Sequence, residues 1–267
     1  MRGLTTEGAG LLAGKNAIVY GAGGLGSGVA HAFAREDARV FLASRTAAPV
    51  VALAAAINAA GAAAEATVLD ALDEHAVNEH MRGVIPHAGT IDISFNLTSR
   101  EDRQGTPLVD MTVEEFTRGP STALTSQFVT ARAAARQMVE QGSGVILALT
   151  SGTARAPSAG MGNTGPADAA VELLMQTLAL ETGPRGVRVL GIHTAAVAET
   201  LTSERIAEIA GRDVDPAVIL SSVAQAATLR RAPTLGRVAD TAAFLASDRA
   251  GDMTGTIVNV TCGLLPG

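Results

Sequence analysis

The stretch Ala17-Ile18-Val19-Tyr20-Gly21-Ala22-Gly23-Gly24-Leu25-Gly26 decides the fold of this chain. An apolar run ends in a glycine-rich turn, and a helix-like stretch follows from Ser27 to Arg35. Strand, turn and helix in this order are the context in which G-x-G-x-x-G indicates dinucleotide binding. Glycine permits the tight turn and lets the backbone approach a pyrophosphate, whose charge faces helix N-terminal amides. We therefore predict that the dinucleotide phosphates are bound by Gly21, Gly23, Gly24, Leu25 and Gly26.

Composition narrows the class of protein. The chain has 267 residues, of which 47% are hydrophobic, and a net charge of −6. An acidic chain without a basic stripe is not expected to bind nucleic acid. The lone Cys262 fits a reducing compartment. No apolar run reaches the length of a membrane span, and the N-terminus lacks a signal-peptide pattern. We expect a cytoplasmic protein with no membrane partner, and no metal, because the histidines lack ligand spacing.

Strand-like and helix-like segments alternate along the whole chain. The strand-like segments are continuous Val/Ile-rich runs, as buried parallel strands are, at Asn16–Tyr20, Arg39–Ala43, Glu65–Leu69, Ile91–Phe95, Gly144–Leu149, Val187–Ile192 and Thr256–Val260. Such alternation predicts one α/β domain over residues 1–267, a doubly wound parallel sheet of about seven strands with helices on both faces. Residues 198–232 are expected to form a helical insertion that covers the ligand crevice as a lid. Thr112-x-x-Glu115 predicts one helix start and Pro120 another.

With these residues laid out, the chain resembles the short-chain dehydrogenase/reductase family along nearly its whole length. The resemblance rests on the glycine loop (one residue shorter than the usual spacing), Asp92–Asn96, Gly144–Ser151 and Gly236–Ser247. It implies a Rossmann-type fold, a small-molecule substrate, a nicotinamide cofactor and a homodimer or homotetramer. It also places Asp70 near the adenine and Asn96 in the turn that follows the fourth strand.

The end of the second strand predicts the choice of cofactor. About 20 residues past the loop, an NAD enzyme usually offers an acid to the ribose hydroxyls. This chain has Ser44 and Arg45 there instead. A guanidinium binds phosphate bidentately, so Arg45 suits a 2′-phosphate. We expect NADP(H) rather than NAD(H), with a solvated loop position as the alternative for Arg45.

The residues that the resemblance assigns to catalysis are changed. The family reduces carbonyls with a tyrosine, a lysine, a serine and an asparagine. Ser151 stands at the serine position, but Thr164 stands at the tyrosine position, Asp168 at the lysine position and Ala123 at the asparagine position. An alkyl hydroxyl is a far weaker acid than a phenol, and Asp168 reverses the local charge. In a structural alternative, Asn163 or Thr164 caps a helix and Asp168 lies in its first turn.

His193 is a candidate replacement acid, since histidine is well matched to proton transfer near neutral pH. We weigh this against a role as a strand-end histidine in the core. The leading hypothesis is an NADP-dependent enzyme that reduces a carbonyl or an imine. Ser151 would orient the substrate, Asp168 would hold the nicotinamide ribose, and Thr164, water or His193 would supply a proton. The alternatives are a non-redox isomerase, lyase or cyclase on the same scaffold, and a non-catalytic cofactor-binding subunit.

Overall fold

The computed structural model describes residues 9–211 and 214–265, which form a parallel α/β structure. Its seven-stranded sheet has the order β3-β2-β1-β4-β5-β6-β7, and every neighbouring pair is parallel. The strands are β1 (Asn16–Tyr20), β2 (Arg39–Ser44), β3 (Ala64–Val68), β4 (Ile93–Asn96), β5 (Gly144–Thr150), β6 (Val187–Thr194) and β7 (Thr256–Val260). The predicted fold class is confirmed, and each strand lies within two residues of its predicted bounds.

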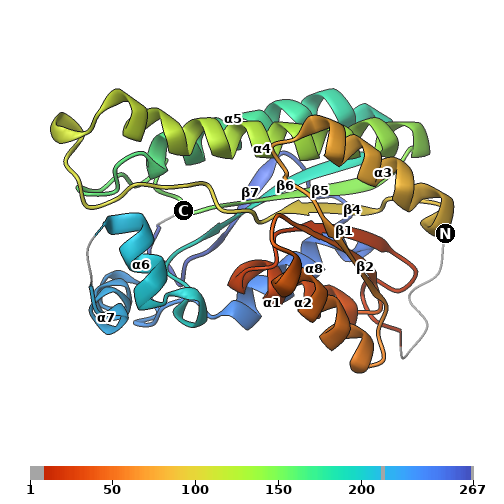
Figure 1. The fold of residues 1–267 in the computed structure, drawn as a ribbon, viewed down its shortest axis with the longest axis horizontal. Helices are drawn as coiled ribbons and strands as arrows, with labels where there is room; N and C mark the ends of the chain where they lie inside the picture. Colours follow the sequence, from red (N-terminus) through yellow and green to blue (C-terminus); the bar gives the residue numbers. More distant parts are fainter. Residues whose placement is uncertain (1–8, 212–213, 266–267) are drawn as a thin grey trace.

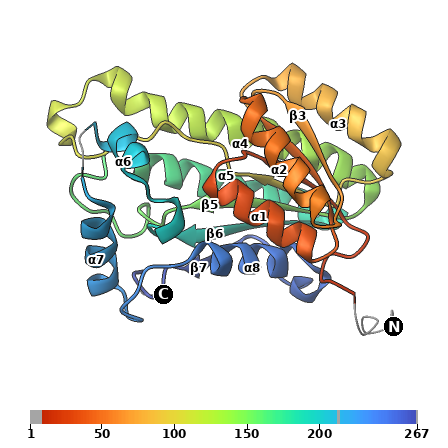
Figure 2. The ribbon, with the colours of Figure 1, turned by 60° about the horizontal axis from the view of Figure 1, so that its bottom comes forward.

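Helices cover both faces of the sheet (Figures 1 and 2). One layer contains α1 (Gly24–Arg35), α2 (Ala47–Ala59) and α8 (Leu235–Ala246), and the other contains α3 (Glu74–Ala88), α4 (Val113–Gln141) and α5 (Thr164–Thr182). Two shorter helices, α6 (Ser203–Ala210) and α7 (Pro216–Ala226), lie between β6 and α8 along the chain. No helix in the described ranges is both long and apolar enough to cross a bilayer.

Strand β1 shows how the sheet separates two apolar cores. Ala17 and Val19 belong to the core under α1 and α8, whereas Ile18 and Tyr20 belong to the core under α3, α4 and α5. Successive side chains of a strand point to opposite faces, so a continuous apolar run is required when both faces are covered. The run Ala17–Tyr20 therefore encodes a central strand.

One predicted boundary is wrong. A single helix, α4, runs from Val113 to Gln141 and contains Pro120, which was expected to begin a helix. The capping box at Thr112 and Glu115 is confirmed. Proline lacks an N–H and so breaks one helical bond, but the following part of α4 buries an alanine-rich face against the sheet. Tertiary packing overrides the local signal here.

The strand order reverses between β1 and β4, which pair with each other near the centre of the sheet. In open parallel sheets, ligands bind at such a switch point, outside the carboxyl ends of the strands. The turn after β1, the segment after β4 and the segment after β5 all leave the sheet at this edge. The fold therefore brings the glycine loop and Ser151 to the same side of the sheet.

A partly buried histidine makes stability depend on pH. His80 on α3 lies edge-to-face with Tyr20, with 6.3 Å between ring centroids, and burial lowers its pKa from 6.5 to about 4. Below pH 6.5 the unfolded chain binds a proton that the folded protein does not take up until about pH 4. Unfolding monitored by circular dichroism should therefore show stability falling between these pH values, by on the order of 3 kcal/mol. His80→Gln should lack this part of the pH dependence; an unchanged profile would contradict the assignment.

Candidate dinucleotide and substrate site

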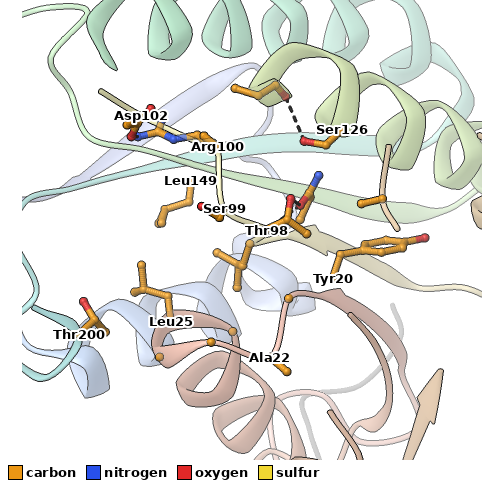
Figure 3. A pocket seen from close by; sticks show the side chains of 18 of the residues that line it. Tyr20, Ala22, Leu25, Thr98, Ser99, Arg100, Asp102, Ser126, Leu149 and Thr200 are labelled. Carbon is orange, nitrogen blue, oxygen red and sulfur yellow. Dashed lines mark hydrogen bonds and ion pairs between the residues drawn. The ribbon is translucent and has the colours of Figure 1, made fainter. Parts of the chain in front are cut away.

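A cavity of about 680 Å³ opens at the carboxyl edge of the sheet (Figure 3). It extends from the turn after β2, across the glycine loop, to the ends of β4, β5 and β6. Among the residues predicted from sequence to bind cofactor or substrate, those that line it are Gly21, Gly23, Gly24, Leu25, Gly26, Ser44, Arg45, Asp70, Asn96 and Ser151. Thr164, Asp168 and His193 are not among the lining residues.

The glycine loop is sterically fixed. Gly21 has a φ of +102°, and a Cβ there would lie 2.7 Å from the carbonyl oxygen of Leu97. A Cβ on Gly26 would lie only 1.9 Å from the carbonyl oxygen of Gly21. Helix α1 begins at Gly24, with no acidic residue in its first turn and no side-chain cap from Gly23. Gly23, Gly24, Leu25 and Gly26 line the cavity, so the N-terminus of α1 opens onto it, as an anionic pyrophosphate requires.

Polar side chains line the part of the cavity that extends from the end of β2 to the end of β4. Arg45 is exposed beside Ser44 and Thr46, and no ion pair to Arg45 occurs among the described residues. Asp70 accepts a bond from the amide of Leu72 at 3.0 Å. Asn96 is buried, with its amide donating to Thr130 Oγ1 at 3.2 Å and its carbonyl oxygen accepting from Thr98. Asn96 thus fixes the turn that follows β4.

The other end of the cavity has an unused hydrogen-bonding group. Thr194, the last residue of β6, is only 5% exposed and lines the cavity. Its hydroxyl has no partner in the part of the chain that the structure describes. A buried polar group without a partner is costly, so a ligand bearing amide groups fits this position. Together with the glycine loop, Thr194 fits a nicotinamide dinucleotide along the cavity.

Ser151 is hydrogen-bonded to the buried carboxylate of Asp168. The Ser151 hydroxyl lies 2.5 Å from Asp168 Oδ2, and the Ser151 amide donates to the same oxygen at 3.1 Å. Thr153 Oγ1 donates to it at 2.7 Å. Asp168 itself is 0% exposed. Ser151 directly follows β5 and lines the cavity, whereas Asp168 on α5 lies behind it and outside the lining.

Arg100 neutralises the buried carboxylate. Its guanidinium makes an ion pair with Asp168 Oδ1 and a second one, at 2.8 Å, with Asp102. Burial alone would lower the pKa of Arg100, but the attraction of Asp102 and Asp168 outweighs that effect and raises it. Arg100 therefore remains a cation, flanked by two acids. Figure 3 shows Arg100 and Asp102 together above the centre of the cavity.

The other predicted catalytic residues have partners of their own. Thr164 is buried and accepts a bond from Gln104 Nε2 at 3.0 Å. His193 Nε2 lies 2.7 Å from Glu172 Oε1, one helical turn beyond Asp168. Thr150 also donates to Glu172, at 3.3 Å. The structure thus brings Ser151 and Asp168 together and places Thr164 and His193 in neighbouring, separate contacts.

The alternative structural interpretation of this segment is wrong in two details. Asn163 is the N-cap residue of α5 but its side chain makes no capping bond, because it binds Arg103 N and Glu115 O instead, at 2.9 and 2.8 Å. The first turn of α5 has no acidic residue, because the helix begins at Thr164 and Asp168 lies beyond that turn. Asp168 is therefore held by side chains and by the Ser151 amide.

Sequence reasoning missed three groups that define the site: Arg100, Asp102 and Glu172. A signal for the first two exists, because only three residues separate the buried strand β4 from the charged run Arg100–Arg103, at the ligand edge of the sheet. The signal for Glu172 is its spacing of four from Asp168, which puts two acids on the buried face of an apolar helix. Buried acids need partners, so such spacing indicates a polar cluster.

The only tyrosine and the only lysine of the sequence, Tyr20 and Lys15, do not direct their polar groups into the cavity. The Tyr20 ring points away from the cavity (Figure 3), is fully buried and has an unpartnered hydroxyl. Lys15 makes a surface ion pair with Asp248 at 3.1 Å. We expect Tyr20→Phe and Lys15→Gln to retain turnover within about twofold and to change stability by no more than about 1 kcal/mol. A loss of turnover above tenfold in either folded variant would contradict this geometry.

Comparisons with known proteins agree with the geometry. The family model described as enoyl-(acyl carrier protein) reductase matches residues 21–265. The short-chain reductase protein NovJ of Streptomyces niveus is 32% identical over 92% of each chain. L-rhamnose 1-dehydrogenase (NAD(P)(+)) of Azotobacter vinelandii is 29% identical over 95% of this chain and 98% of its own. A 7α-hydroxysteroid dehydrogenase structure, complexed with NADH and 7-oxo glycochenodeoxycholic acid, is 28% identical, with a TM-score of 0.81 over 94% of each chain.

Fold and site together define a dinucleotide-binding α/β protein with its ligand cavity at the switch point of the sheet. The chain belongs to the short-chain dehydrogenase/reductase family. Members of this family are NAD(P)-dependent oxidoreductases that act on small molecules.

Proposed function

We propose that this protein is an NADP(H)-dependent oxidoreductase that reduces a carbon–oxygen or carbon–nitrogen double bond at a site without the family's tyrosine and lysine. The observation that carries the proposal is that one cavity contains both the glycine loop and Ser151, whose hydroxyl contacts a buried carboxylate. The bound cofactor supplies hydride at its nicotinamide ring. The protein has to bind, orient and shield the reactants.

Residues of the chain divide this work. Gly21–Gly26 and the N-terminus of α1 hold the pyrophosphate, while Asp70 borders the adenine end. Thr194 hydrogen-bonds the carboxamide of the nicotinamide, and Ser151 contacts the reacting group of the substrate. Asp168 acts through Ser151, because Asp168 is fully buried. This differs from the expected direct contact between Asp168 and the nicotinamide ribose. When a proton is required it comes from water in the cavity, since Thr164 and His193 are engaged elsewhere.

The insertion between β6 and α8 closes the substrate end of the cavity. Glu199 and Thr200 and, on α6, Arg205 and Ile209 line it. A Cβ on Gly24 would lie 2.8 Å from Thr200 Cγ2, so this segment already contacts the glycine loop. We propose that α6 acts as the lid, within the predicted insertion 198–232, and that the whole chain works as one domain.

We also propose a homodimer or homotetramer built on α4 and α5. Leu173 and Leu180 on α5 are 65% and 81% exposed, and Phe128 on α4 is 44% exposed. Removing such side chains from water favours association.

Substitution of Arg45 tests the cofactor proposal. Arg45 is exposed at the end of β2 and lines the cavity, where a 2′-phosphate would accept from its guanidinium. The emission of the reduced cofactor can be titrated without interference, since the chain has no Trp. We expect NADPH to bind with a Kd of micromolar order, more tightly than NADH, and Arg45→Gln to weaken NADPH about tenfold or more while leaving NADH within about twofold. Equal effects on both cofactors would overturn the NADPH preference, and no binding of either would overturn the function.

A further inference from the structure

We infer that the substrate carries a protonated carbon–nitrogen double bond, an iminium ion, because the Ser151–Asp168 pair presents a hydrogen-bond acceptor to the cavity. This inference rests on the proposed function and names the substrate class of the same site. It follows from which groups donate hydrogen bonds to Oδ2 of Asp168.

The hydrogen-bond partners of the Ser151 hydroxyl, Asp168 and Thr153, both lie outside the cavity lining. At 2.5 Å, Ser151 Oγ and Asp168 Oδ2 are in the range of a short hydrogen bond between a hydroxyl and a carboxylate. Two oxygens at that separation without a proton between them repel. Thr153 Oγ1 lies 2.7 Å from Asp168 Oδ2 and 2.9 Å from Ser151 Oγ. Neither Thr153 nor Asp168 lines the cavity, so whichever of the two accepts the Ser151 proton, that proton points away from the cavity. The hydroxyl of Ser151 therefore directs its proton away from the cavity and its remaining lone pairs toward a ligand.

That polarity opposes a ketone and favours an iminium ion. A carbonyl oxygen is an acceptor and would face the lone pairs of Ser151 Oγ, whereas an iminium N–H donates to them. The charge of this cluster also favours an iminium ion, since Asp168 and Asp102 carry two negative charges and Arg100 carries one positive charge. Cations are stabilised beside such a cluster, and a developing alkoxide is not.

The atoms and electrons of iminium reduction also balance without a proton donor at the site. The reduced nicotinamide gives a hydride to the iminium carbon, the C=N π pair moves to nitrogen, and a neutral amine and oxidised cofactor result. The nitrogen keeps its hydrogen, so the step needs no proton donor. Reduction of a ketone needs one, and because Thr164 and His193 do not line the cavity, that proton would have to come from water. Oxidation of an alcohol at this pair would instead place a proton on Asp168 and remove the partner of Arg100.

Asp168→Asn should reverse the polarity. Arg100 donates to Oδ1 of Asp168, so an asparagine keeps its carbonyl oxygen there and places its amide nitrogen opposite Ser151 Oγ and Thr153 Oγ1. The variant gives up the bond that the Ser151 backbone amide donates to Oδ2 in the wild-type protein. The asparagine amide donates to the Ser151 hydroxyl, which is then free to donate into the cavity. A single isosteric change thus turns the acceptor into a donor.

Turnover of three small cyclic substrates of matched shape is measured with wild-type protein and NADPH. The substrates are an imine that protonates at neutral pH, its N-methyl iminium salt and a ketone. We expect kcat/KM for the protonating imine to exceed that for the ketone by about 100-fold, and the N-methyl salt, which has charge but no N–H, to lie between them. Asp168→Asn should reduce the imine-to-ketone ratio at least about tenfold, and Lys15→Gln should leave it unchanged.

Binding gives a second measure, which remains usable if Asp168→Asn folds poorly. With oxidised cofactor present, calorimetry should show that the saturated cyclic ammonium binds wild-type protein at least about tenfold more tightly than the ketone. Ser151→Ala should weaken the ammonium and spare the ketone. Equal or tighter binding of the ketone, or equal turnover of ketone and imine, would overturn the iminium assignment alone. Absence of cofactor oxidation with all three substrates would instead count against the proposed function.

Discussion

Replacement of Arg100 by alanine is expected to lower the free energy of unfolding by about 3–5 kcal/mol, the cost of leaving buried acids without their counterion. Arg100 is paired with Asp168, whose side chain is 0% exposed, and with Asp102, whose side chain is 7% exposed. Removing the guanidinium leaves two buried carboxylates near each other without their counterion. Chemical denaturation followed by circular dichroism measures the change.

Arg155→Ala is the matched control for this prediction. Arg155 also pairs with a buried acid of α5, Glu172, at 3.3 Å, but its own side chain is 58% exposed. Exposed pairs contribute about 0–1 kcal/mol, so little stability should be lost. If both arginine variants lose equal stability, the Arg100–Asp168 cluster is not the buried charge centre that the structure shows.

Substitution of Gly26 is expected to have the second large effect. A Cβ at Gly26 would lie 1.9 Å from the carbonyl oxygen of Gly21, so Gly26→Ala must displace the loop or the start of α1. Overpacking of this kind costs about 1–3 kcal/mol or more. Since the displaced atoms include the amides that face the pyrophosphate, the Kd for NADPH should rise at least about tenfold, which corresponds to about 1.4 kcal/mol.

Gly23→Ala separates crowding from the mere loss of a glycine. Gly23 has an ordinary φ of −75°, and a Cβ on it would have no neighbouring atom within 4 Å. The stability of this variant should therefore stay within about 0.5 kcal/mol of wild type. Equal destabilisation by the two alanine substitutions would contradict the close approach of Gly26 and Gly21.

Local chemistry explains why the fold was predictable. The run Ala17–Tyr20 before Gly21 is continuously apolar, as a strand covered on both faces requires, and the glycines after it fix a tight turn. Pro120 shows the limit of such reasoning. Its effect on α4 depends on how much of the later helix is buried, and a proline in the sequence carries no such information.

The site was predictable only in part, because its decisive contacts join distant residues. Ser151 and the glycine loop follow from their positions at strand ends. Asp168 and Arg100 are 68 residues apart, and nothing local pairs them. The same holds for His193, whose partner Glu172 is 21 residues away. The sequence therefore predicts the elements that carry these side chains, while their pairing depends on tertiary structure.

The most direct test of the account is to follow the transferred hydrogen. Wild-type protein is mixed with the cyclic imine and NADPH that carries deuterium at the transferred position, and the product is analysed by mass spectrometry and NMR. The account predicts one deuterium on the former imine carbon, on a single face, with oxidised cofactor formed in equal amount. Product that forms without deuterium, or that still forms after all nucleotide has been removed, would contradict it and would point to a non-redox reaction on this scaffold.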